Sequence, residues 1–271
     1  MSQTIFITGS STGIGRATAI EFQKQGWNVV ATMRAPDDER ELGELENVQV
    51  LELDVTRPQV IDAAYEAAVA RFGSVDVLVN NAGYGAFGAL EAFSFEQIER
   101  QFDTNVIGLL SVTKAFIPDF RRRGAGTIVN VSSMGGLYAF PLGSLYHGSK
   151  FAVEGITEAL YYEMGAIGVR VKLIEPGRVE TDFGTRSMDR AMDPEMTEYL
   201  PLINALIAAS SAPDTTRSTP EEVARKIFEV VTEDSDQVRY AVGADAEQAL
   251  AARKAMDDTA FLAHIKGVFG L

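Results

Sequence analysis

Two side chains four residues apart have the types that acid–base chemistry requires. Tyr146 and Lys150 close the segment 132–150, which also carries the hydroxyl groups of Ser132 and Ser133. If a helix begins at Tyr146, Lys150 lies on the same helical face. An ammonium about 4 Å from a phenol is worth about 4 kcal/mol at an effective dielectric constant of about 20, enough to bring the phenol pKa from about 10 to about 7. The segment predicts a catalytic centre, although Tyr-x-x-x-Lys alone is also a common surface pairing.

The composition argues against several other chemistries. The 271 residues are 46% apolar and 23% charged, which suits one α/β domain or two small ones. With no cysteine and only two histidines, disulfides, thiol chemistry and Cys- or His-rich metal sites are excluded, and we expect no metal. The net charge of −14 disfavours nucleic acid as a partner.

No targeting or membrane-spanning segment is expected. The first residues lack a basic region followed by a long apolar core, and the apolar run at 200–209 is too short to span a bilayer. We therefore expect a cytoplasmic protein without a membrane span.

A glycine loop lies near the start of the chain. Residues 4–8 read as a strand, Gly9, Gly13 and Gly15 follow, and residues 16–25 read as an amphipathic helix closed by Gly26. Such glycines let the backbone approach a pyrophosphate, whose charge is held by amide groups at the helix N-terminus. The alternative is an ordinary tight turn.

The residue after the second strand bears on the choice of nucleotide. Residues 28–33 and 48–55 read as strands, and Arg34 stands where a carboxylate would accept from a ribose 2′-hydroxyl. An arginine there offers a planar donor fork to a 2′-phosphate, so NADP is favoured over NAD. Asp37 or Asp38 remains an alternative ribose partner. Asp54 either contacts the adenine or caps a turn.

The remaining chain alternates strands and helices. Strands are predicted at 75–80, 127–132, 169–175 and, as a seventh edge strand, 237–242; helices are predicted at 59–72, 94–117 (stopped by Pro118), 146–166 and 247–271. Asn105 falls inside the predicted helix 94–117, either at an exposed position or at a local distortion with a purpose. Short loops between alternating elements predict a mainly parallel sheet with helices on both faces, and ligands beyond the carboxyl ends of its strands.

Taken in order, these motifs resemble the single-domain short-chain dehydrogenase/reductase family over about the first 182 residues. The resemblance implies one Rossmann-like, doubly wound, seven-stranded domain over residues 1–271, with strand order 3-2-1-4-5-6-7. It implies NAD(P)-dependent oxidation or reduction at a carbonyl or alcohol carbon. The catalytic residues that it implies are Asn105, Ser133, Tyr146 and Lys150. The cofactor-binding residues are Gly9, Ser11, Thr12, Gly13, Ile14, Gly15, Arg34, Asp54, Val55, Asn81, Ala82, Gly83, Tyr146, Lys150, Pro176, Gly177, Val179 and Thr181.

The same resemblance assigns roles. Ser133 rather than Ser132 has the family's spacing to the tyrosine and would donate to the carbonyl, while Tyr146 delivers the proton as hydride leaves the nicotinamide. Lys150 would favour the tyrosinate and hold the ribose. Asn105 would anchor a water that resupplies protons, and Thr181 would contact the carboxamide. His147 points away round the helix and is given no chemistry.

Residues 182–218 interrupt the regular pattern and are predicted to form a substrate lid, with an apolar helix resting on the core as the alternative. Its apolar residues are Phe183, Met188, Met192, Tyr199, Leu200, Ile203 and Leu206. With Phe140, Leu142 and Leu145 they predict a pocket for a largely apolar carbonyl compound or alcohol. The resemblance suggests a homodimer or homotetramer, and residues 247–271 are a possible contact.

Two other functions compete with this hypothesis. A nucleotide-sensing or scaffold protein would need only the glycine loop, so the complete hydroxyl, phenol and ammonium set argues against it. An epimerase or dehydratase of the same broad fold would typically space the glycines differently.

Overall fold

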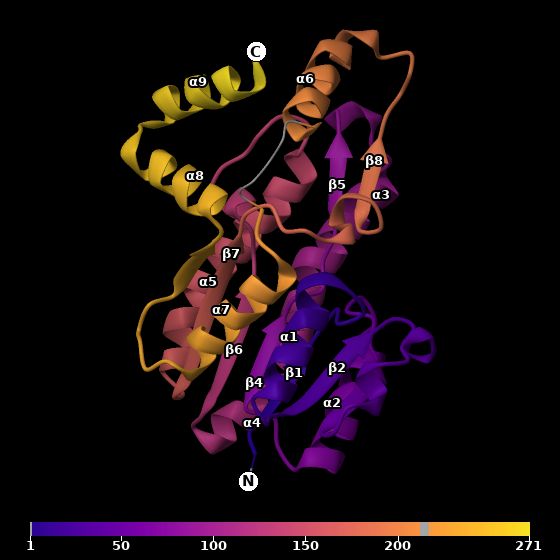
Figure 1. Ribbon diagram of the computed structural model, residues 1–271, viewed down its shortest axis with the longest axis vertical. Coiled ribbons are helices and arrows are strands. Elements are labelled where there is room, and N and C mark those ends of the chain that lie inside the picture. The colour runs from indigo at the N-terminus through magenta and orange to yellow at the C-terminus, as the bar shows by residue number, and fades with distance from the viewer. Residues whose placement is uncertain (1, 212–216) are drawn as a thin grey trace.

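The computed structural model describes residues 2–211 and 217–271 and is built around a seven-stranded parallel sheet (Figure 1). Its spatial order is β3-β2-β1-β4-β6-β7-β9, and every neighbouring pair is parallel. This confirms the predicted order, because the two omitted strands belong to a second sheet. The strands are β1 (Thr4–Ile7), β2 (Asn28–Met33), β3 (Val48–Glu52), β4 (Val77–Asn80), β6 (Gly126–Val131), β7 (Val169–Pro176) and β9 (Arg239–Val242).

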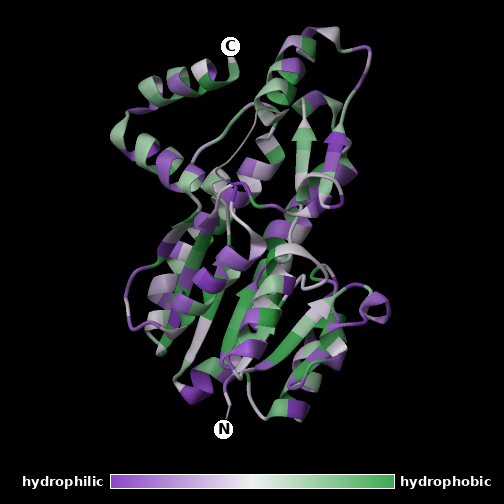
Figure 2. Cartoon of the chain, in the orientation of Figure 1, coloured by the Kyte–Doolittle hydropathy of each residue, from purple (hydrophilic) through white to green (hydrophobic). Residues whose placement is uncertain are grey.

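Helices cover both faces of this sheet because its strands are apolar on both sides. In β1, Ile5 and Ile7 pack on one face with α1 (Gly13–Lys24) and α7 (Pro220–Thr232). Phe6 points to the other face, which is covered by α2 (Pro58–Phe72), α4 (Leu109–Arg123) and α5 (Ser144–Gly165). Figure 2 shows the resulting hydrophobic central strands. Continuous apolar strands of this kind are typical of a sheet buried on both faces.

The predicted helix 94–117 is wrong in two respects. The capping box at Ser94 does open α3 (Phe95–Phe102), but residues Asp103–Gly108 form a π-helical segment before α4 begins. The helix then continues through Pro118 to Arg123. Burial of Phe116 and Phe120 on either side of the proline holds the helical path despite the missing N–H group.

A second, two-stranded parallel sheet was not predicted. It joins β5 (Gly85–Gly88) to β8 (Met188–Ala191) and lies beyond the carboxyl ends of the central strands (Figure 1). The same end of the molecule carries α6 (Leu200–Ser211), α8 (Ala244–Ala255) and α9 (Asp258–Phe269). The predicted helix 247–271 is thus two helices, with Asp257 capping the second. The predicted lid 182–218 contains β8 and α6, while its residues 212–216 lie outside the described part.

Within the described residues, no helix is both long and apolar enough to cross a bilayer. The same residues contain no group of three or more His, Cys, Asp or Glu side chains arranged to hold a metal ion.

Candidate active site

The glycine loop makes a tight turn between β1 and α1. Gly9 and Gly13 have φ angles of 71° and 57°, which L side chains rarely adopt. A Cβ atom on Gly15 would lie 2.4 Å from the carbonyl oxygen of Gly9. The helix begins at Gly13, with no acidic residue in its first turn and no hydrogen bond from the Thr12 side chain to its amides. Ser11, Ile14 and these amides form a cradle suited to a phosphate.

Asn81 ties this loop to the end of β4. Its Nδ2 donates to the carbonyl oxygens of Thr8 (2.9 Å) and Gly9 (3.1 Å). In return, the Thr8 hydroxyl accepts from the backbone N–H groups of Asn81 and Ala82, both at 3.0 Å. The turn after β4 is therefore a clamp on the glycine loop as well as a turn.

An exposed cation, Arg34, lies at the edge beside β2. Arg34 is exposed directly after the strand and makes no hydrogen bond or ion pair in the described parts of the chain. Arg16, in contrast, is paired with Glu41 and Glu39. Asp54 caps a turn: its Oδ1 accepts from the N–H (3.0 Å) and hydroxyl (2.7 Å) of Thr56.

The structure also shows the positions of the other residues predicted at this edge. Asp37 and Asp38, the alternative ribose partners, are exposed in a short turn. Val55 is buried and packs against Gly108, whose added Cβ would lie 2.7 Å from a Val55 methyl group.

Tyr146 and Lys150 are both buried on α5, which begins at Ser144. The Lys150 ammonium donates to the carbonyl oxygen of Val131 at 2.9 Å. Burial lowers the pKa of Lys150 to about 8, with the charge of Glu154 opposing this. Burial raises the pKa of Tyr146, and a hydrogen bond with the Ser133 hydroxyl acts in the opposite direction. The expected lowering of the phenol pKa by the ammonium is therefore wrong for this arrangement, because desolvation of the phenol dominates.

The two adjacent serines face different partners. Ser133 opens a short turn, accepts from the Gly135 N–H at 3.0 Å and contacts Tyr146. Ser132 is buried, and its Oγ lies close to Glu154 Oε1 beside Gly136. Only Ser133 is therefore brought together with the phenol.

Asn105 lies in the π-helical segment and is 3% exposed, which excludes the exposed alternative. Its Oδ1 accepts from the Tyr84 N–H at 3.0 Å, and its Nδ2 donates to the Tyr84 carbonyl (2.9 Å) and the Ser149 hydroxyl (3.0 Å). A Cβ on Gly83 would lie 3.1 Å from Asn105 Oδ1 and 3.9 Å from Lys150 Nζ. The Asn105 amide and the Lys150 ammonium therefore both lie beside Gly83.

The segment after β7 returns to the glycine loop. Pro176 ends β7, and Val179 bridges to Ser218. Thr181 lies beside Gly13, where an added Cβ would come within 3.1 Å of its methyl group. A pocket of about 210 Å³ is lined by Gly13, Thr181 and neighbouring side chains.

Asp245 fixes the start of the same segment and was not predicted. Its Oδ2 accepts from the Arg178 N–H at 2.7 Å, and a Cβ on Gly177 would lie 2.0 Å from its Oδ1. No spacing in the sequence links residue 245 to residue 177, since strand pairing of β7 with β9 brings them together.

Aromatic rings surround the phenol. Tyr146 lies 5.2 Å from Phe87 and 5.8 Å from Phe183, measured between ring centroids. Phe87 stacks on Phe140 at 6.1 Å, and Phe140 contacts Phe269 of α9 at 5.9 Å. Phe140 and Phe183 were predicted near the site. Phe87 and Phe269 were missed, because the small sheet and the fold of α9 bring them there.

The other predicted pocket residues are placed less centrally. Leu145 is buried under the small sheet, and Leu142 adopts a positive φ of 62°. Met192 and Leu200 are exposed, and the Tyr199 hydroxyl donates to Glu91 at 2.6 Å. Met188 lies in β8; Ile203 and Leu206 are partly buried in α6.

His147 holds the loop that carries these groups. Its Nδ1 lies 2.8 Å from the Gly135 carbonyl oxygen, and its Nε2 accepts from the Phe140 N–H at 3.2 Å. Burial lowers the pKa of His147, with the Gly135 carbonyl opposing this. A neutral imidazole with its proton on Nδ1 satisfies both contacts.

Known proteins are similar to this chain in sequence and in architecture. Residues 3–191 match the family model described as short chain dehydrogenase. An uncharacterized oxidoreductase of Schizosaccharomyces pombe is 42% identical over 239 residues, which are 88% of this chain and 100% of the other. A solved short-chain dehydrogenase from Streptomyces avermitilis has 32% identity and a TM-score of 0.83, covering 94% of this chain and 92% of that one.

Several similar solved structures contain nicotinamide cofactors, and two of them illustrate both kinds. ElxO with NADP bound has 27% identity and a TM-score of 0.74, covering 89% of this chain and 97% of its own. A 3-ketoacyl-(acyl-carrier-protein) reductase from Brucella melitensis, complexed with NADH, has 29% identity and a TM-score of 0.76, covering 89% and 96%. The chain belongs to the short-chain dehydrogenase family and is an NAD(P)-dependent dehydrogenase or reductase.

Proposed function

We propose that the protein is an NADP(H)-dependent carbonyl reductase or alcohol dehydrogenase for a largely apolar ketone or secondary alcohol. The observation that carries this proposal is the placement of the Ser133 hydroxyl beside a buried Tyr146, next to the aromatic rings of Phe87 and Phe183. This arrangement offers two hydroxyls to one carbonyl oxygen in an apolar surrounding.

The chemistry divides between cofactor and chain. When bound, a nicotinamide would supply the hydride. Ser133 donates to the carbonyl oxygen, and Tyr146 transfers its proton to that oxygen as the C–H bond forms. Lys150, held at the Val131 carbonyl one helical turn from the phenol, is the group from which the tyrosinate left behind would recover its proton. Asn105 is a positioning residue, since its side chain fixes the turn at Tyr84 beside Lys150.

The glycine loop, the Asn81 clamp and Thr181 would hold the cofactor. Gly9, Gly15 and the first amides of α1 fit its pyrophosphate, because the glycines carry no side chain and the first turn of α1 has no acidic residue. The preference for NADP rests on Arg34, an exposed guanidinium suited to bidentate contact with a 2′-phosphate. Similar solved structures hold either cofactor, NADP in ElxO and NADH in the Brucella melitensis reductase, so the proposed preference rests on Arg34.

The substrate class rests on the aromatic rings around Tyr146. Phe87, Phe140, Phe183 and Phe269 come from four different elements and leave the phenol with apolar neighbours. Such a surrounding favours an apolar chain or ring beside the carbonyl. The segment 182–218 is proposed as the lid over it.

We also propose a cytoplasmic homodimer or homotetramer. The support for self-association is exposed apolar residues on the α3–α5 side, including Phe95 (79% exposed) and Tyr162 (70% exposed). Light scattering coupled to size-exclusion chromatography measures the assembly directly, and a monomer would exclude it.

Tyr146→Phe tests the proposed acid. NADPH oxidation with a panel of apolar ketones should fall by about 10²–10⁴-fold in the variant, while NADPH affinity stays within about twofold. Tyr162→Phe, on the exposed side of the same helix, is the matched control and should retain activity. Unchanged turnover in Tyr146→Phe would remove the assigned acid. Cofactor binding without turnover of any substrate in the wild-type protein would favour the nucleotide sensor.

A further inference from the structure

Two buried carboxylates lie near Lys150, one of them a helical turn further along α5. Glu154 of α5 and Glu175 of β7 are 4% and 2% exposed. The Nε atom of Arg239 lies 3.0 Å from Glu154 Oε2 and 3.6 Å from Glu175 Oε1, so both acids share one guanidinium nitrogen. Glu154 follows Lys150 by one helical turn, and the exposed Glu158 follows Glu154 by another. A stripe of ionisable side chains therefore runs along α5 from Tyr146 to the surface.

The charges of this cluster do not balance if every group is ionised. Arg239 carries one positive charge, and its Nη2 atom already donates to Glu158 at 2.7 Å. Among the described contacts, Lys150 makes no ion pair with Glu154. Two desolvated carboxylates beside one shared cation retain a proton between them. Burial and the charge of Glu154 raise the pKa of Glu175 to about 8, against the opposing effect of Arg239. Burial also raises the pKa of Glu154, opposed by Ser132, Arg239 and Lys150.

Oxygen atoms without hydrogen-bond partners lie between the two acids and the backbone that holds Lys150. Glu154 Oε1, Glu175 Oε1 and Ser132 Oγ are buried and have no hydrogen-bond partner among residues 2–211 and 217–271. A Cβ on Gly136 would lie 2.6 Å from Ser132 Oγ and 2.9 Å from Glu154 Oε1, so these two atoms face the same point. Ser132 adjoins Val131, whose carbonyl holds the Lys150 ammonium. Buried oxygens left unpaired are costly and call for an explanation.

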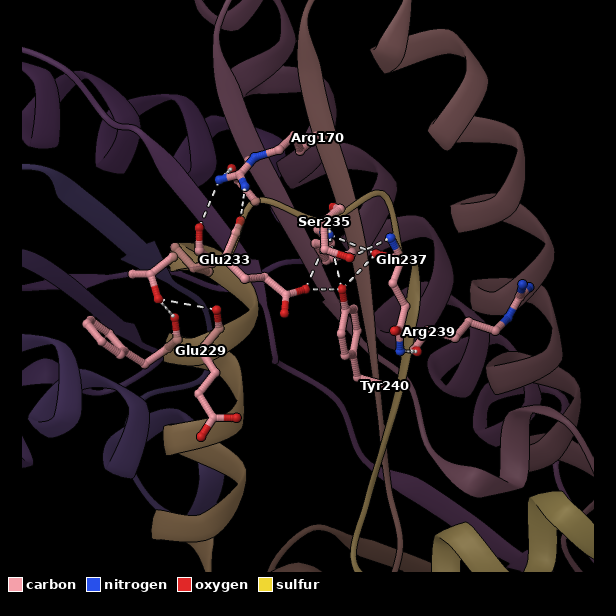
Figure 3. A network of polar contacts seen from close by, with 12 residues as sticks. Arg170, Glu229, Glu233, Ser235, Gln237, Arg239 and Tyr240 are labelled. Carbon is pink, nitrogen blue, oxygen red and sulfur yellow. Dashed lines mark hydrogen bonds and ion pairs between the residues drawn. The ribbon is translucent and has the colours of Figure 1, made fainter.

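The position of Arg239 is fixed from the other side. Figure 3 shows the contacts that anchor the start of β9 and the turn before it, with the Arg239 side chain pointing away from them. Tyr240 donates to the Gln237 carbonyl at 2.9 Å, and Arg170 donates to the Glu233 carbonyl at 2.7 Å. The guanidinium is thereby held over the two acids.

We propose that Glu154 and Glu175 store one proton between them and, through Ser132, return it to Lys150 after each reduction. In that step the Tyr146 O–H bond breaks as the product O–H forms, Lys150 reprotonates the phenolate, and the carboxyl pair reprotonates Lys150. Solvent at Glu158 and Arg239 then restores the stored proton, so one proton enters per hydride transferred. The proposal rests on the reductase function proposed above, and adds a proton supply separate from Asn105.

Glu175→Gln tests the store because the amide keeps the shape of the acid and holds no exchangeable carboxyl proton. In heavy water, the infrared C=O band of a protonated carboxylic acid should be present in the wild type at pH 7 and lost in the variant. Reduction should slow by about tenfold with a larger solvent deuterium isotope effect and an altered pH profile, while NADPH affinity stays within about twofold. Glu158→Gln, exposed at the end of the stripe, is the matched control and should retain the band.

Each outcome decides the proposal. Absence of the acid band in the wild type, or its persistence in both Glu175→Gln and Glu154→Gln, overturns the stored proton. Loss of the band with an unchanged pH profile and isotope effect overturns its delivery to Lys150. If Glu175→Gln does not fold, Glu154→Gln is measured in the same way. A wild type that shows the band and reduces no carbonyl compound overturns the reductase function alone.

Discussion

At the scale of single residues, burial outweighs the pairing of Tyr146 with Lys150. Both side chains lie on one face of α5, yet the ammonium is held by the Val131 carbonyl, and desolvation shifts both groups toward their neutral forms. The phenol's direct partner is Ser133. Because burial favours the neutral forms of Tyr146 and Lys150, a mechanism for this site must say where the proton that Tyr146 gives up is replaced. The buried acids Glu154 and Glu175 are the proposed source of that proton.

Arg34→Ala is expected to change cofactor choice. Removing a charge-assisted contact to the 2′-phosphate should weaken NADPH binding by about 10- to 100-fold and leave NADH binding nearly unchanged. Titration of both cofactors against the intact and variant proteins measures the ratio. Arg40→Ala, also exposed and close in sequence, is the control. An unchanged NADPH-to-NADH ratio in Arg34→Ala would contradict the proposed preference.

At the scale of elements, two features without a strong sequence signal shape the site. The π-helical segment Asp103–Gly108 turns Asn105 inward, where its amide satisfies both backbone groups of Tyr84. The small sheet of β5 and β8 then brings Phe87 against Tyr146. Local distortions of this kind commonly accompany functional sites.

Gly88→Ala is expected to disturb the small sheet. Gly88 has a φ of 158°, and an added Cβ would lie 2.2 Å from the Ala191 carbonyl oxygen, so β5 and β8 must separate. The KM for apolar substrates should rise by about tenfold or more, at about 1.4 kcal/mol per factor of ten, with NADPH affinity unchanged. Gly155→Ala, in a helix with open space around it, should be neutral or slightly stabilising. Faster amide exchange at residues 188–191 in Gly88→Ala, but not in Gly155→Ala, would confirm that β5 and β8 have separated. An unchanged KM in Gly88→Ala would contradict a role of the small sheet in substrate binding.

At the scale of the whole molecule, the parallel sheet gathers distant segments at one end. The glycine loop, the turn after β4, Ser133 and the segment after β7 all follow carboxyl ends of neighbouring strands. The same architecture buries β7 on both faces, which places Glu175 inside the protein. A buried acid makes folding stability depend on pH.

The sign of this dependence follows from Glu175, whose pKa is raised from 4.5 to about 8. Between these values the folded protein keeps a proton that the unfolded chain has lost, so the contribution of Glu175 to stability falls as the pH rises. The slope approaches about 1.4 kcal/mol per pH unit, or about 2–4 °C in melting temperature per unit. Glu175→Gln should flatten the melting-temperature curve between pH 5.5 and 7.5, whereas Glu158→Gln should not. Parallel wild-type and Glu175→Gln curves would contradict a protonated Glu175.

The sequence by itself determined the alternation of strands and helices, the family and the strand order of the central sheet. These features depend on local signals: apolar runs, glycine spacing, the capping box at Ser94 and the Tyr146-x-x-x-Lys150 pair. Element ends were less well predicted: residues 53–55 and 237–238 lie outside β3 and β9. The predicted helix end at Pro118 was also wrong: α4 continues to Arg123, because burial of its apolar side chains outweighs the missing hydrogen bond.

Only the tertiary structure decided what surrounds the phenol and the lysine. Phe87 and Phe269 lie 59 and 123 residues from Tyr146 in sequence, and Arg239 lies 64 residues from Glu175. No spacing rule connects such pairs, because they meet through the second sheet, the fold of α9 and the pairing of β7 with β9. The pKa values of Tyr146, Lys150 and Glu175 depend on the burial and charge that those long-range contacts create, so they could be known only once the chain was folded.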